Sequence, residues 1–258
     1  MAQMKIEAEA RLCASFEKDL LDNLGSMSAA QLRSLHVALV SVSNWFYGRA
    51  MQTNSDEDIN LVVSSVPPTG AVDLNLAANG MAWLTKVFGI KVPQGPYYRI
   101  HDLDFVAKKD RDLNLYRNDR ESYARKLREK FPVGTSMTVE NSKPLVSFTS
   151  DLSAVKKFSK TNGGKKKDTD VYLKVEQNNR VTPVFFNGAI PSTAIAAAKS
   201  VDKKAAYAKT KDKVLLKNVT SSLVYALMIA NEFKHQKEVV CVLKGKKFDA
   251  TLLEYAKR

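Results

Sequence analysis

The sequence predicts an α+β protein in which a helical region over 1–96 precedes a mixed domain of strands and helices over 97–258. Apolar residues recur at three- and four-residue steps through much of the first region, which is the period of an amphipathic helix. Short runs rich in β-branched and aromatic residues follow Pro96. Hydrophobic residues make up 45% of the 258 residues, which is enough for a packed core.

Three helices are expected in the N-terminal region. The first covers 7–24 and ends at a glycine, the usual residue after a helix C-terminus. Ser28 can cap the second, over 29–47, because its hydroxyl can accept a hydrogen bond from a backbone N–H of the first turn. The third covers 72–88 and ends at Gly89.

Six runs in the second domain have the composition of strands. They are 97–100, 145–149, 170–175, 182–186, 214–216 and 238–243. Helices are expected between them, over 119–131, 152–159, 193–208 and 221–232. Because the strands and helices do not alternate strictly, the pattern indicates an α+β domain and not a parallel α/β sheet.

The positive charge is concentrated in the second domain. The chain has a net charge of +13, but residues 1–96 contain 7 Lys and Arg against 9 Asp and Glu, a net of −2. Residues 97–258 contain 33 against 18, a net of +15. Such an asymmetry indicates that the second domain meets a polyanion. A lysine-rich surface that only keeps the protein soluble is the alternative.

Several common classes lack support in the sequence. No apolar run reaches the roughly 18–20 residues of a membrane span, and the N-terminus has no signal-peptide core. Cys13 and Cys241 are too few for a disulfide framework or a zinc site, so we expect no metal and a cytoplasmic location. The signatures of dinucleotide folds, P-loops, zinc hydrolases and serine hydrolases are absent from the sequence.

Three segments of the second domain carry polar residues on predicted strands. The first, directly after the proline-rich break, carries Arg99. The second carries the hydroxyls of Ser147 and Thr149, two residues apart on one strand face. In the third, Gln236 and Glu238 are also two apart, so we expect both side chains on the same face of a strand.

In this order and spacing, the three segments resemble the Arg–Ser–Glu signature of ADP-ribosyltransferases. In that family an aromatic–Arg strand, a Ser-x-Ser/Thr strand and a final (Gln/Glu)-x-Glu strand line one cleft that holds NAD. The resemblance covers 97–245 and implies a split β-sandwich fold for the catalytic domain. Phe233 stands three residues before Gln236, where the family often has an aromatic. This chain departs from the pattern at Ile100, where the family often has a small residue, and at Phe148, inside the serine motif.

The resemblance implies a role for each residue, with NAD as the substrate. Cleavage of the N-glycosidic bond leaves positive charge on the ribose, which Glu238 would stabilise. Arg99 would hold the pyrophosphate through its fork of donors. Ser147 would orient the ribose and Glu238, and Thr149 would support the strand. A competing last strand at 211–216 has a lysine where the carboxylate belongs, so Glu238 is preferred.

The acceptor is predicted from the glutamine and from the charge. In the family, Gln-x-Glu accompanies asparagine or guanine acceptors, and the Gln236 amide can pair with either because it donates and accepts hydrogen bonds. The basic domain, with Lys165, Lys166 and Lys167 for phosphates and Phe233 for stacking, favours single-stranded RNA or DNA. A protein side chain and non-enzymatic nucleic-acid binding are the alternatives. The resemblance also implies a toxin or phage-related effector held by an antitoxin or another inhibitory protein, without a membrane partner.

Overall fold

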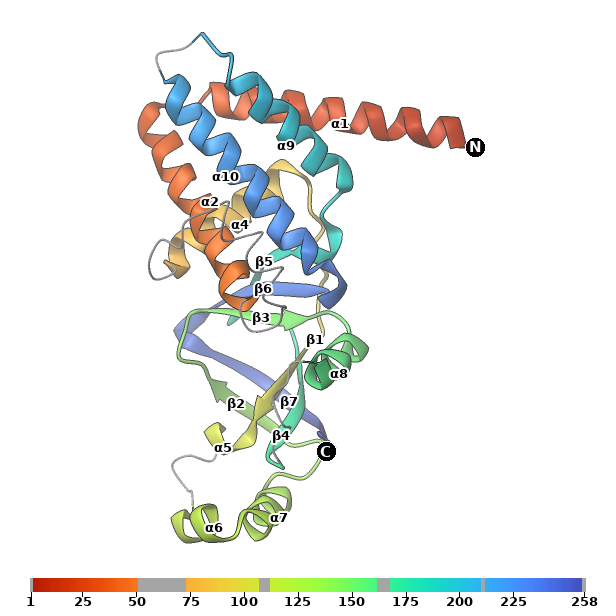
Figure 1. Ribbon diagram of the computed structural model, residues 1–258. Coiled ribbons are helices and arrows are strands. Elements are labelled where there is room, and N and C mark those ends of the chain that lie inside the picture. The colour runs from red at the N-terminus through yellow and green to blue at the C-terminus, as the bar shows by residue number, and fades with distance from the viewer. Residues whose placement is uncertain (1, 51–72, 107–111, 162–167, 210–211, 257–258) are drawn as a thin grey trace. The chain divides into compact units, whose positions relative to one another are not determined.

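The computed structural model describes residues 2–50, 73–106, 112–161, 168–209 and 212–256 (Figure 1). The contacts divide the chain into two compact units. We call 1–92 with 184–235 the helical unit, and 93–183 with 236–258 the sheet unit. The sheet unit therefore begins close to the expected domain boundary at 96/97, and the segment 184–235 groups with the N-terminal helices.

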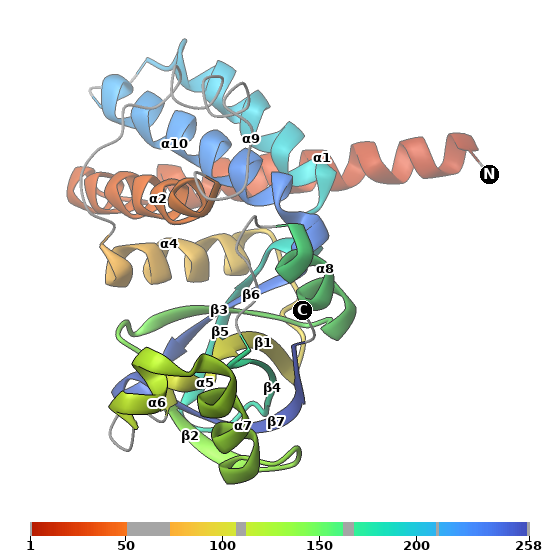
Figure 2. The same cartoon turned by 60° about the horizontal axis from the view of Figure 1, so that its bottom comes forward.

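The described residues of the helical unit include five long helices. They are α1 (Ala2–Gly25), α2 (Ala29–Ala50), α4 (Leu74–Val87), α9 (Ser192–Ala205) and α10 (Lys213–Glu232). Figure 2 shows α2 lying between α10 and α4, and α2 contacts both of them. Helix α9 packs against α1 and α10. The helices expected at 7–24, 29–47, 72–88 and 193–208 are thus confirmed; α1 begins five residues earlier than expected, and the other ends differ by at most three residues.

Local sequence accounts for the way α2 begins and packs. Ser28 forms a capping box with Gln31: the Ser28 backbone N–H donates to Gln31 Oε1 at 2.8 Å, and the Gln31 N–H donates to Ser28 Oγ at 3.3 Å. Leu32, Leu35 and Leu39 then recur on one face and are all buried. The cap fixes where the helix begins, and the apolar face holds it in the unit.

Helix α10 is the one described helix long and apolar enough to span a membrane by length and composition alone. Its buried positions include Leu223, Ala226, Leu227 and Ala230, and it packs against α2 and α9. A core helix of a soluble protein passes the same test of length and hydropathy. The packing of α10 against α2 and α9 is that of a core helix.

Seven antiparallel strands form one open sheet, so the protein belongs to the α+β class. The strands are β1 (Tyr97–Asp102), β2 (Ser136–Glu140), β3 (Leu145–Thr149), β4 (Asp170–Val175), β5 (Val181–Phe186), β6 (Glu238–Leu243) and β7 (Lys247–Tyr255). Their order is β2-β7-β4-β1-β3-β6-β5. Strand β5 begins in the sheet unit and continues into the helical unit.

Shorter helices connect the strands. They are α5 (Leu103–Val106), α6 (Leu113–Asn118), α7 (Arg120–Lys130), α8 (Leu152–Thr161) and the 3₁₀ turns η2 (Asn187–Ala189), η3 (Lys234–Gln236) and η4 (Lys244–Lys246). The helices expected at 119–131 and 152–159 are confirmed as α7 and α8. Helix α8 covers one face of the sheet, where Val155 and Leu152 pack with Tyr172 and Ile100.

The structure corrects the strand prediction in two ways. Residues 214–216, expected as a strand, form the first turn of α10, so no strand at 211–216 competes with β6 for the last motif within the described residues. Strands β2 and β7 were not expected from the sequence. The other five expected strands are confirmed, and those at 145–149, 170–175 and 238–243 have the expected ends.

Candidate active site

The three motif segments lie on neighbouring strands. Arg99 is on β1, Ser147 on β3 and Glu238 at the first position of β6, and the sheet order places β3 between the other two (Figure 1). Residues separated by about 140 positions in the sequence therefore meet on three consecutive strands. One shared cleft requires this adjacency and also a common sheet face, which Arg99 does not share with Ser147 and Glu238.

Ser147 and Glu238 are in direct contact. Glu238 lies opposite Thr149 in the β3–β6 register, and Ser147 lies opposite Val240, so the two side chains are diagonal neighbours on one face. The Ser147 hydroxyl donates a hydrogen bond to Glu238 Oε1. The Glu238 side chain is buried, with 3% of the residue exposed. A hydroxyl thus fixes the orientation of a buried carboxyl group.

This face of the sheet carries a continuous row of polar side chains. Each residue of the row lies opposite the next in the strand register, which places all of them on the same face. We call them the polar row: Ser136, Thr251, Lys174, Tyr98, Thr149 and Glu238. The opposite face carries mainly aromatic and apolar residues, as in the stacked rings of Tyr97 and Phe148, whose centroids are 6.0 Å apart. Arg99 is a charged exception on that face.

The Arg99 side chain lies on the opposite, mainly apolar face of the sheet and contacts the backbone of Ser147. It is adjacent to Tyr98 of the polar row, so strand alternation places it on the other face, opposite Leu173. Its Nη1 donates to the carbonyl oxygen of Ser147 at 2.9 Å. Among the described residues, β1 and β3 align at one pair, Tyr98 with Thr149. Arg99 therefore supplies a donor to β3 where the backbone pairing of the two strands ends.

The charge of Arg99 acts on His101, which follows on the same strand face. Burial, and after it the nearby Arg99 charge, lower the pKa of His101 from 6.5 to about 4, while Asp102 opposes the shift. His101 is therefore neutral at physiological pH. Of these two neighbouring side chains, Arg99 therefore carries the positive charge and His101 carries none.

Gln236 does not lie in a strand, so the expected strand over Gln236 and Glu238 is wrong in its first two residues. Gln236 is the last residue of η3, and Lys237 has φ of 48°, in the left-handed region. Strand β6 begins only at Glu238. Thr149 Oγ1 donates to the Gln236 carbonyl oxygen at 2.9 Å, so the backbone of Gln236 is held beside the motif by the end of β3.

The other predicted acceptor residues are distributed differently. Phe233 is the C-cap of α10 in the helical unit and is 5% exposed, and its carbonyl oxygen accepts a hydrogen bond from Asn187 at 2.9 Å. An exposed ring for base stacking is not found at this position. The predicted phosphate ligands Lys165, Lys166 and Lys167 lie outside the described residues.

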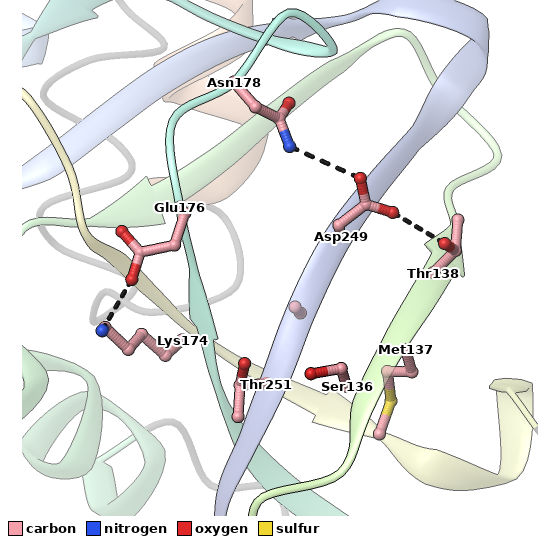
Figure 3. Close-up of a pocket in the computed structure, with 9 residues that line it drawn as sticks. Ser136, Met137, Thr138, Lys174, Glu176, Asn178, Asp249 and Thr251 are labelled. Carbon is pink, nitrogen blue, oxygen red and sulfur yellow. Dashed lines mark hydrogen bonds and ion pairs between the residues drawn. The ribbon is translucent and has the colours of Figure 1, made fainter.

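A pocket of about 330 Å³ opens on the same sheet face, at the far end of the polar row (Figure 3). Its lining includes Ser136, Thr251 and Lys174, which is paired with Glu176 at 2.6 Å. Asp249 accepts hydrogen bonds from Thr138 at 2.7 Å and from Asn178 at 3.4 Å across it (Figure 3). Sequence reasoning missed this pocket because two of its strands, β2 and β7, were not expected; the alternation of β7 is the signal that could have found it.

Comparison of the chain with known protein families, with curated proteins and with solved structures finds no match. Within the described residues, no group of three or more His, Cys, Asp or Glu side chains is placed to hold a metal ion.

Proposed function

We propose that the protein is an NAD-dependent mono-ADP-ribosyltransferase that modifies a nucleic-acid base. The observation that carries this proposal is the buried Glu238 carboxyl group, held by the Ser147 hydroxyl on one neighbouring strand, with Arg99 of the next strand bonded to the same serine. These are the three residue types of the signature, on adjacent strands and in the expected order.

The arrangement suits cleavage of a glycosidic bond. The bond between the nicotinamide nitrogen and C1′ of the ribose breaks, and its electron pair leaves with nicotinamide. The ribose acquires oxocarbenium character, which the Glu238 carboxylate stabilises electrostatically. An acceptor nitrogen or oxygen then forms a bond to C1′ and loses its proton. Ser147 keeps the carboxylate in place through this change.

Charge supports a nucleic-acid acceptor. The sheet unit contains 25 Lys and Arg against 15 Asp and Glu, a net of +10, whereas the helical unit contains 15 against 12, a net of +3. The positive charge therefore accompanies the unit that carries the motif. Cationic surfaces bind phosphate backbones through release of counterions. An enzyme of this type would act in the cytoplasm, where NAD and nucleic acid meet, as a toxin or phage-related effector restrained by an inhibitory protein.

A protein side chain is the second candidate acceptor, and the burial of Phe233 favours it. A base acceptor was expected to stack on this ring, but only 5% of the residue is exposed. An asparagine, glutamine or arginine acceptor needs no such platform. Gln236 can address either class, because an amide both donates and accepts hydrogen bonds.

The test is nicotinamide release by the purified protein, with Glu238→Gln as the variant. Loss of the charge should cost about 3–5 kcal/mol of transition-state stabilisation, or roughly 10²–10⁴ in rate. Glu254→Gln is the matched control, because Glu254 also lies in the sheet but is partly exposed and paired with Lys156. Full release by the Glu238 variant would overturn the assignment. Absence of NAD binding up to millimolar concentration in calorimetry would favour a basic binding module.

The acceptor is identified by where the label goes. NAD labelled in its adenylate part is incubated with separate RNA, DNA and protein pools. Label that is removed by nuclease supports the base acceptor. Label that resists nuclease and is removed by protease would replace it with the protein acceptor.

A further inference from the structure

The residues just before Glu238 are held by contacts from the end of β3. Thr149 Oγ1 donates to the Gln236 carbonyl oxygen at 2.9 Å, and the Ser150 N–H donates to the Lys237 carbonyl oxygen at 3.1 Å. Lys237 Nζ forms an ion pair with Asp151 Oδ2 at 2.7 Å. We call these contacts, from 149–151 to 236–237, the β3 clamp.

The backbone at Lys237 makes such a clamp necessary. A lysine at φ of 48° is in a region that residues other than glycine adopt at a cost and keep only where the surroundings enforce it. This residue turns the chain from η3 into β6, so strand alternation does not determine the direction of the Gln236 side chain. The clamp instead holds the carbonyl groups on both sides of the Lys237 Cα.

Asp151 is itself well positioned for this contact. Its Oδ1 accepts a hydrogen bond from the Ser153 N–H at 2.8 Å, which caps the start of α8. The Lys237 ammonium and the donors of Ser153 hold the pKa of Asp151 well below its usual range, so the carboxylate is ionised at neutral pH. Helix α8 thereby anchors the acid that holds Lys237.

We infer that Asp151 and Lys237 are positioning residues that hold Gln236 in place for the acceptor, and that they set how the ADP-ribosyl group divides between acceptor and water. The inference rests on the proposed function. Glu238 is fixed separately, by Ser147 and by pairing of β6 with β3. Loosening the clamp therefore disturbs the residue that faces the acceptor and leaves the carboxylate that acts on NAD in place.

The variants are Asp151→Asn and Lys237→Gln. Asparagine keeps the oxygen that caps α8 and removes only the charge. Each variant should lower the ratio of acceptor transfer to NAD hydrolysis by about 3- to 10-fold and raise the KM for the acceptor, while nicotinamide release without acceptor stays within about twofold. The double variant should be no worse than either single variant, because both remove the same interaction.

Lys247→Gln is the matched control, because Lys247 is about as exposed as Lys237 and forms an ion pair with Glu140, at 2.9 Å, away from Gln236. Hydrogen exchange provides a readout independent of activity: amides of 236–238 should exchange faster in the two clamp variants and not in the control.

The outcomes separate the two proposals. An unchanged transfer ratio, additive effects in the double variant, or nicotinamide release that falls in parallel with transfer would each overturn the clamp and leave the transferase assignment standing. If the wild-type protein releases no nicotinamide, the proposed function fails, and the role of the clamp in acceptor transfer fails with it.

Discussion

Replacing Ser147 with alanine should destabilise the protein measurably, because it removes a hydrogen bond to a buried carboxyl group. Glu238 is 3% exposed and accepts its bond from the Ser147 hydroxyl. A hydrogen bond to a charged group contributes about 1.5–3 kcal/mol, so a loss of about 2 kcal/mol is expected. For a protein of this size that corresponds to a Tm lower by about 4–8 °C.

The assay is thermal unfolding followed by circular dichroism, with urea unfolding as a second measure. Ser142→Ala is the control, because Ser142 is exposed and a surface substitution usually changes stability by less than about 0.5 kcal/mol. The same Ser147 substitution in a Glu238→Gln background should cost only about 1 kcal/mol, since the acceptor is then uncharged. Equal losses in the two backgrounds, or a loss no larger than that of Ser142→Ala, would refute the coupling between serine and carboxylate.

Three further predictions concern stability. The folded-state pKa of His101 is about 4 against 6.5 in the unfolded chain, so the unfolded state binds the proton first as pH falls. The free energy of unfolding should therefore fall by up to about 3 kcal/mol between pH 6.5 and 4. Urea unfolding at both pH values should show a smaller fall for His101→Gln than for the wild type. An equal fall in the two proteins would contradict the lowered pKa of His101. Gly80→Ala would place a Cβ 2.8 Å from the Ala38 carbonyl oxygen, so thermal unfolding should show a loss of about 1–3 kcal/mol, and wild-type stability would contradict the close approach of α2 and α4. Tyr123→Phe removes the donor to the buried Asp104 carboxyl group, a bond of 2.5 Å, and should cost about 1.5–3 kcal/mol in chemical unfolding, whereas no change would mean that this bond contributes nothing.

The fold was predictable where the sequence pattern is strong and local. Leu32, Leu35 and Leu39 recur at helical spacing, and their helix is present. Strand β7 was predictable in principle, because Phe248 and Leu252 belong to an inward-facing set that alternates with polar residues. At 214–216, by contrast, a short β-prone run is absorbed by a helix of 20 residues, whose length and packing outweigh a weak local preference.

The candidate site was predictable in its residues but not in its faces. The contact of Ser147 with Glu238 follows once β3 and β6 are neighbours in the register that the structure has. Whether Arg99 shares a face with Ser147 and Glu238 depends on one register pair between β1 and β3, and a shift of that pairing by one residue would reverse the outcome. The position of Gln236 depends on the left-handed backbone conformation of Lys237. Sequence patterns predict that conformation for glycine and not for lysine.

The division of the chain into interleaved segments has a consequence for its synthesis. Helices α1 and α2 leave the ribosome early, but their partners α9 and α10 follow only after the whole of 93–183 has been made. Apolar faces of the nascent helices therefore stay uncovered during translation of most of the sheet, and the last strands of the sheet come later still, after residue 235. Neither unit can finish folding before nearly the entire polypeptide exists, and long-range closure of this kind slows folding. Cutting the gene at any codon between 93 and 235 would divide the chain of both units.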